Sequence, residues 1–133
     1  MALALGFAGT SAFADGFRCE GDSSTLRVKL YNQVQPEKGT RNPATMVISD
    51  AHQGTLLVAS GDEIRKHNRQ NTVQYVVEGN KKLGAETAIL QVAFKQGRET
   101  IAEGDEVDGQ LILVSEEGDR EVFELSCARY KKQ

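Results

Sequence analysis

Tryptophan is absent from this sequence of 133 residues, and proline, cysteine and histidine occur only twice each. With five phenylalanines and three tyrosines as the only aromatic residues, a sugar-stacking platform or an aromatic ligand cage is disfavoured. Acidic residues outnumber lysine and arginine, and the formal net charge of −3 lacks the basic excess of nucleic-acid-binding proteins. We therefore expect no nucleic-acid partner, while a cationic partner is compatible with the charge.

Long hydrophobic runs are also missing, and the most apolar segment lies at the start of the chain. Residues 2–9 are apolar or glycine, and Ala12-Phe13-Ala14 follows shortly after them. This pattern predicts a signal peptide over residues 1–14, with a core strand or helix as the alternative. The run is too short for a transmembrane segment, which needs about 20 apolar residues. Because no lysine or arginine precedes it, we expect the signal peptide to be truncated at its start.

Residues 15–133 are enough for one domain around one hydrophobic core. Export places this domain in the periplasm or outside the cell, where the compartment is oxidising. No cysteine lies beside the expected cleavage site, so a lipoprotein anchor is not indicated.

The two cysteines, Cys19 and Cys127, lie near opposite ends of the expected domain. In an exported protein this pair predicts one structural disulfide, and the absence of CxxC spacing disfavours a reactive thiol pair. A disulfide requires Cα atoms within about 7 Å, so the first and last strands must be neighbours or face each other. A closed barrel or a compact sandwich satisfies this condition.

Short runs with alternating or β-branched residues follow one another along the domain. In residues 24–32, Leu26, Val28 and Leu30 share one face, which is typical of a half-buried strand. No segment has a long helical apolar stripe. Further strands are expected at residues 44–50, 55–59, 72–78, 86–95, 110–115 and 121–127, with a short edge strand and turn at 63–70, a polar loop at 33–42, turns at 52–54, 79–84 and 117–119, and an acidic loop at 97–108 that includes a short strand around 100–102.

Seven to nine short strands joined by turns predict an all-β fold. We expect an antiparallel β-barrel of about eight strands, closed by the terminal disulfide, with a sandwich as the alternative. A barrel is favoured because closure leaves no strand edge exposed.

The acidic loop is a weak candidate for a metal site. Its spacing does not match a calcium-binding loop, so we expect a solvated loop and no metal. Its acidic residues are Glu99, Glu103, Asp105, Glu106 and Asp108.

Catalytic motifs are equally weak. His52 and His67 lack the spacing of zinc ligands, and no nucleophile elbow surrounds Ser60. A Ser–His–Asp triad assembled from distant residues remains an alternative. We expect that the protein is not an enzyme and has no cofactor.

Two basic clusters lie in the regions expected to form turns. The first spans residues 65–69, and the second is Lys81 and Lys82. Most such clusters are solvated hairpin tips. The alternative is a positive loop that inserts into a carboxylate-lined cleft.

The segment Phe17-Arg18-Cys19-Glu20-Gly21, followed by Leu26-Arg27-Val28 and Asn32, resembles the opening strands of the periplasmic and membrane-bound inhibitors of C-type lysozyme. Cys127 near the end of the chain, the export signal and the size resemble that family too. The resemblance covers mainly the first residues after the expected signal peptide.

In that family, a loop centred on Ser-Gly and a loop containing lysine enter the active site of lysozyme. The resemblance implies these roles for Ser60 and Gly61 and for Lys82. The sequence departs from the family where Leu83 separates Lys82 from Gly84. The tyrosine expected after Ser-Gly and the tryptophan expected before the lysine are also missing.

We therefore expect a secreted, non-catalytic binding module whose partner is a protein such as lysozyme, inhibited by loop insertion. One alternative is a lipocalin-like carrier of a small apolar ligand, because eight-stranded barrels are wide enough for one. Another is an envelope-associated structural protein.

Overall fold

The computed structural model describes residues 16–31, 44–94, 101–102 and 104–129. The expected signal peptide at 1–14, the polar loop at 33–42 and part of the acidic loop lie outside these residues. The described chain forms nine strands and one turn of 3₁₀ helix, η1 (Gly61–Glu63). The strands are β1 (Gly16–Gly21), β2 (Leu26–Tyr31), β3 (Thr45–Asp50), β4 (Gly54–Ser60), β5 (Arg65–Arg69), β6 (Thr72–Glu78), β7 (Thr87–Val92), β8 (Glu106–Val114) and β9 (Arg120–Arg129).

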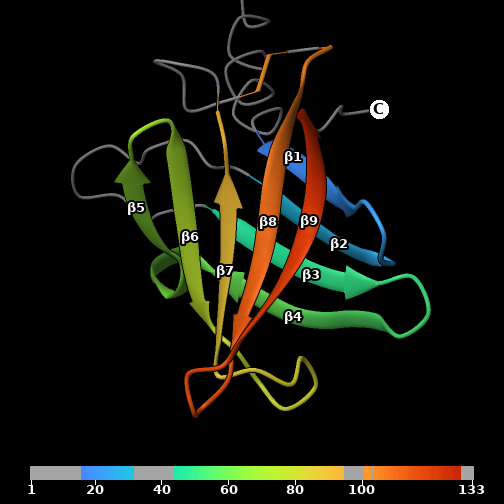
Figure 1. The fold of residues 1–133 in the computed structure, drawn as a ribbon, viewed down its shortest axis with the longest axis vertical. Helices are drawn as coiled ribbons and strands as arrows, with labels where there is room; N and C mark the ends of the chain where they lie inside the picture. The colour runs from blue at the N-terminus through green and yellow to red at the C-terminus, as the bar shows by residue number, and fades with distance from the viewer. Residues whose placement is uncertain (1–15, 32–43, 95–100, 103, 130–133) are drawn as a thin grey trace, which may run out of the picture.

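All nine strands belong to one antiparallel sheet in the order β4-β3-β2-β1-β9-β8-β7-β6-β5. The chain runs as two meanders, β1 to β4 and β5 to β9, which the pairing of β1 with β9 joins. Figure 1 shows the sheet curling, so that β1–β4 run across the view behind β6–β9. No helix in the described part of the chain is long and apolar enough to cross a membrane.

The all-β, antiparallel prediction is confirmed, but the closed barrel of about eight strands is wrong. The strands form a single curled sheet, a half-barrel, whose two edges are β4 and β5. The disulfide joins β1 to β9 in the middle of this sheet and therefore does not bring β4 to β5. Strands β4 and β5 follow each other in the chain but do not pair. The 3₁₀ turn η1 and Ile64 lie between them and change the direction of the chain.

Most expected strands and turns are present, including β6 at the predicted residues and β5 as an edge strand. The acidic loop was predicted too long. Strand β8 begins at Glu106, so Glu106 and Asp108 are exposed strand residues on either side of buried Val107. Ile101 and Ala102 do not belong to a strand.

The hydrophobic core lies on the concave face of the sheet and follows the period of two that β-strands impose. Phe17 packs at its centre, with its ring centroid 6.1 Å from that of Tyr75 and 5.8 Å from that of Phe94. Large side chains therefore fill the interior. The fully buried side chains include Phe17, Val28, Leu30, Met46, Ile48, Val77, Leu90, Val92, Leu111 and Leu125.

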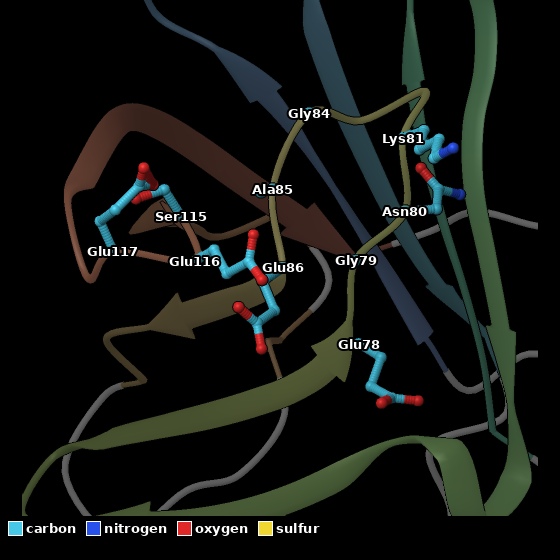
Figure 2. Close-up of a pocket in the computed structure, with 10 residues that line it drawn as sticks. All are labelled: Glu78, Gly79, Asn80, Lys81, Gly84, Ala85, Glu86, Ser115, Glu116 and Glu117. Atoms are coloured by element: carbon cyan, nitrogen blue, oxygen red, sulfur yellow. The ribbon is translucent and has the colours of Figure 1, made fainter.

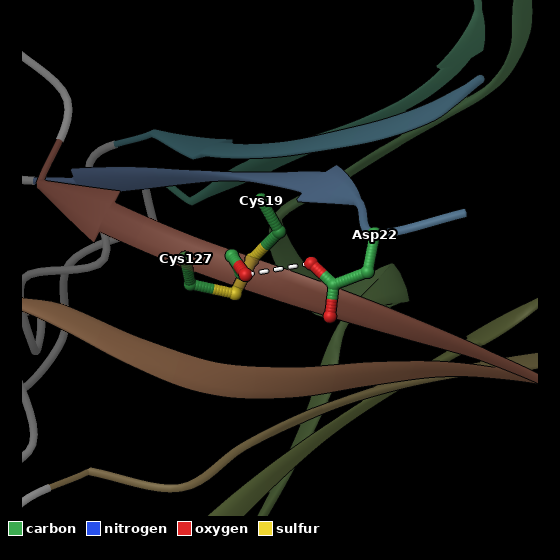
Figure 3. Close-up of a disulfide and its surroundings, with 4 residues drawn as sticks. Cys19, Asp22 and Cys127 are labelled. Carbon is green, nitrogen blue, oxygen red and sulfur yellow. Dashed lines mark hydrogen bonds between the residues drawn. A yellow bond between two sulfur atoms is a disulfide. The ribbon is translucent and has the colours of Figure 1, made fainter. Parts of the chain in front are cut away.

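The predicted disulfide between Cys19 and Cys127 is confirmed. The two residues are direct partners in the β1–β9 register, and both are fully buried. Figure 3 shows the bridge between the two strands, with a hydrogen bond beside it in which the Ser126 hydroxyl donates to Asp22 Oδ1 at 2.7 Å. The covalent link and this bond fix the strand pairing that joins the two meanders into one sheet.

A glycine on β8 leaves the space that the buried disulfide occupies. A Cβ atom added to Gly109 would lie 2.7 Å from Cys127 Sγ and 3.2 Å from the carbonyl oxygen of Gln91. The sulfur atom of Cys127 therefore occupies the space that a side chain at position 109 would need, and only glycine fits opposite the disulfide.

The turn at residues 51–53 is built on the carboxylate of Asp50. The backbone N–H groups of His52 and Gln53 donate to Oδ1 at 2.8 and 3.2 Å, and the Thr25 hydroxyl donates to Oδ2 at 2.8 Å. These hydrogen bonds, chiefly the one from the His52 N–H, hold the pKa of Asp50 below its ordinary value. His52 thus lies in a turn whose shape is held by the hydrogen bonds to the Asp50 carboxylate.

Removing the disulfide by Cys19→Ala/Cys127→Ala is expected to lower the free energy of unfolding by about 4–5 kcal/mol in the chain-entropy model. The reason is the large loop that it closes, a sequence separation of 108 residues. Chemical denaturation of the oxidised protein and the variant measures the difference. A loss below about 1 kcal/mol would contradict the importance given to this link.

The substitution Gly109→Ala is expected to destabilise the oxidised protein by about 1–3 kcal/mol, because the new methyl group overlaps the sulfur of Cys127. The same substitution in the Cys19→Ala/Cys127→Ala background is the control. Its cost must be smaller there, and equal costs in both backgrounds would show that the sulfur is not the obstacle.

Candidate functional site

The structure places the residues implied by the family resemblance in two separate segments. Ser60 ends β4, Gly61 begins η1, and the Ser60 N–H donates to Glu63 Oε1 at 2.8 Å. Lys82 lies in the loop between β6 and β7. A hydrogen bond joins that loop to β4 at Leu56, four residues before Ser60, which is about 13 Å along an extended strand. Within one chain, Ser60 and Lys82 are therefore not adjacent, and Figure 1 shows the two connections at different places.

The β6–β7 loop is held in shape by Asn80. Its side-chain amide donates to the carbonyl oxygen of Leu56 at 3.1 Å, and its Oδ1 accepts the N–H of Leu83 at 2.7 Å. The N–H of Gly84 donates to the Asn80 carbonyl oxygen at 3.0 Å. Leu83 is buried, whereas Lys81 and Lys82 are exposed. The loop thus presents two lysines on a backbone that is tied to β4 and to the core.

The base of this loop is closed by backbone contacts. The backbone N–H of Gly79 donates to the Glu86 carbonyl oxygen at 2.7 Å, and the backbone N–H of Glu86 donates to the Val114 carbonyl oxygen at 2.9 Å. The second bond connects the β6–β7 loop to the end of β8, so the β6–β7 and β8–β9 loops lie next to each other. A Cβ on Gly79 would lie 2.0 Å from the Ala85 carbonyl oxygen, which explains why glycine stands there.

Between these two loops is an open hollow of about 510 Å³. Figure 2 shows the residues around it, with Lys81 and Asn80 on one arm and Ser115 and the β8–β9 loop on the other. Four glutamates and one lysine give its lining a formal charge of −3. The glutamates are Glu78, Glu86, Glu116 and Glu117.

We name this region the glutamate end: the β6–β7 and β8–β9 loops with the four glutamates. Its acidic lining can form ion pairs with cationic groups. The sequence analysis missed this group, although a signal was available. Glu78 ends β6, Glu86 precedes β7, and Glu116 and Glu117 follow β8, so a meander with these turns must gather them at one end of the sheet.

A second hollow, of about 290 Å³, lies on the convex face of β7–β9. It is bordered by a row of amides in cross-strand register. Gln74 donates to Gln91 at 2.8 Å, Gln91 to Gln110 at 3.3 Å, and Gln110 to Glu124 at 2.9 Å. These groups satisfy one another, so the row stabilises the sheet and leaves few donors for a ligand.

Metal-binding side chains are not gathered anywhere in the part of the chain that the structure describes: no group of three or more histidine, cysteine or acidic residues is placed to hold an ion. His52 lies in the β3–β4 turn and His67 lies on the edge strand β5. Of the acidic loop, Glu99 and Glu103 lie outside the described residues.

Comparisons with known proteins returned no relative: no family model, no curated protein and no solved structure matches this chain.

Replacing Asn80 with alanine is expected to lower the free energy of unfolding by about 1–2 kcal/mol, because its side chain makes two hydrogen bonds. Faster hydrogen exchange at the Leu83 amide would show that the loop itself loosens. The neighbouring Lys81→Ala is the control and is expected to stay within about 0.5 kcal/mol. An unchanged Leu83 exchange rate in Asn80→Ala would refute the anchoring role.

Proposed function

We propose that this chain is an exported, non-catalytic binding module that inhibits an enzyme of the C-type lysozyme class. In this proposal it binds with the glutamate end. The observation that carries the proposal is the pairing of a rigid loop bearing Lys81 and Lys82 with an open hollow of charge −3 beside it.

The two charge types suit different parts of such a partner. Glycosidases cleave with a pair of carboxylates in the active-site cleft, and a lysine inserted between them gains charge-assisted hydrogen bonds. In this arrangement Lys82 enters the cleft. The glutamates behind it pair with basic side chains on the rim, which steers the encounter and fixes the orientation.

The filled interior supports a binding surface over a carrier. An eight-stranded barrel that holds a ligand needs a central space, whereas here Phe17 packs against both Tyr75 and Phe94 inside the curled sheet. Binding at the loops requires no such space. The preorganised hydrogen bonds of Asn80 lower the entropy that the loop loses when a partner binds.

The test is inhibition of a C-type lysozyme by the oxidised chain, with binding measured by calorimetry. Lys82→Ala is expected to weaken inhibition by about thirtyfold or more, because truncating one partner of a buried charge pair costs about 2–5 kcal/mol. Glu116→Gln/Glu117→Gln is expected to weaken binding mainly through a slower association rate, with less dependence on salt.

The matched control is Arg65→Ala, which removes an exposed cation from the other basic cluster, on β5. It is expected to inhibit like the unmodified chain. Absence of binding by the unmodified chain, or equal loss in Arg65→Ala and Lys82→Ala, would overturn the proposal. Ser60→Ala separates the two loops, since a loss equal to that of Lys82→Ala would place the contact at η1 instead.

A further inference from the structure

The edge strand β5 is cationic. Its sequence, Arg-Lys-His-Asn-Arg, has two arginines and one lysine and no acidic residue, a formal charge of +3 in a chain whose net charge is −3. Strand β6 is its only partner in the described part of the sheet, so one side of β5 is not covered by another strand (Figure 1). The other edge, β4, is capped by Glu63 and Asn80, which bond to backbone groups of Ser60 and Leu56.

Three side chains of β5 form a row on the convex face of the sheet. Arg65, His67 and Arg69 are exposed, and alternate residues of a strand lie on one face, about 7 Å apart. Within the described residues no hydrogen bond or ion pair engages these side chains. The charge of the two arginines is therefore not neutralised from inside the sheet. Their register partners on β6 are also uncharged: Val76, Gln74 and Thr72.

The β5–β6 turn determines which backbone groups point to the uncovered side. Only two residues connect the strands, so Arg69 and Thr72 close the hairpin as a hydrogen-bonded pair. Pairs alternate along an antiparallel ladder, so the next pair, Asn68 with Val73, is not hydrogen-bonded. The N–H and C=O of Asn68 therefore point away from β6, and within the described residues nothing else bonds to them.

We propose that β5 binds an extended acidic segment of a partner protein as an added antiparallel strand. Asn68 forms a hydrogen-bonded pair of the new ladder, and the residues on either side of it form non-hydrogen-bonded pairs, in which side chains lie closer together. Carboxylates at alternate positions of the segment then lie opposite Arg65, His67 and Arg69. Opposite charges that face each other across two strands stabilise the pairing.

The same features disfavour other occupants of this edge. A second β5 would bring cations opposite cations, which destabilises a strand pair. The phosphates of a nucleic acid accept hydrogen bonds from arginine, but they offer no donor to the C=O of Asn68. An extended peptide supplies a donor and an acceptor on one residue. In strand addition the main-chain bonds give affinity, and the alternate side chains give specificity.

The test uses the labelled, oxidised full chain and a synthetic peptide in which glutamate alternates with threonine. Amide chemical shifts are followed by nuclear magnetic resonance, and hydrogen exchange at Asn68 is measured in parallel. The expected result is shift changes concentrated in residues 65–69 with slower exchange at Asn68. Unchanged exchange at Asn68 with millimolar peptide overturns the proposal. Since no enzyme is present, the result does not depend on lysozyme inhibition at the glutamate end.

Two further peptides separate strand pairing from charge attraction alone. The first has the same composition with its glutamates in one block. The second is N-methylated at the threonines, whose N–H groups point to β5 in the proposed register. Both are expected to bind at least about fivefold more weakly, because each loses contacts of the ladder. Equal binding by these peptides, or by an oligonucleotide of the same charge, contradicts strand addition.

Charge reversal locates the surface. Arg65→Glu/Arg69→Glu is expected to weaken binding of the glutamate peptide by at least about tenfold, and to favour a peptide with lysine at those positions. Arg18→Glu/Arg27→Glu is the matched control. It changes the net charge by the same amount at exposed positions of β1 and β2, which lie inside the sheet, and is expected to leave binding unchanged. Equal weakening in both double variants overturns the assignment to β5.

Discussion

The pairing of β1 with β9 is the constraint on which the rest of the structure depends. Each meander is built from local hairpins, and this single long-range pairing, locked by Cys19–Cys127, makes them one sheet. The curl that follows gives the concave face a continuous core around Phe17. It also decides which strands become edges, because the joined ends of the chain lie in the middle of the sheet. The placement of β4 and β5 at the two edges of the sheet follows from that one pairing.

Much of this fold could be predicted from the sequence, and the part that could not has a physical reason. The alternation of Leu26, Val28 and Leu30 indicates one buried face, and two cysteines in a chain that is expected to be exported indicate one disulfide. Closure was predicted wrongly because it depends on whether β4 pairs with β5, a non-local choice that no alternation encodes. A clue was nevertheless present: the charged segment at 65–69 has the composition of an edge strand, and a closed barrel has no edge to offer it.

For the candidate site too, the sequence suggested individual residues but not how the fold arranges them in space. The resemblance to lysozyme inhibitors directs attention to Ser60 and Lys82, but it does not specify that β4 and the β6–β7 loop hold them apart. The anchoring of that loop by Asn80 depends on a carbonyl group 24 residues away and leaves no trace in local spacing. The glutamates were within reach of prediction, since antiparallel hairpins that turn at one end of a meander bring their flanking residues together.

The central claim is that the glutamate end is a protein-binding surface, and nuclear magnetic resonance tests it most directly. Amide chemical shifts of the labelled oxidised chain are followed while an unlabelled C-type lysozyme is added. The account predicts that the largest changes fall in residues 79–86 and 115–119, with β5 and the β3–β4 turn unaffected. Changes confined to other surfaces, or no changes at saturating enzyme, would contradict it.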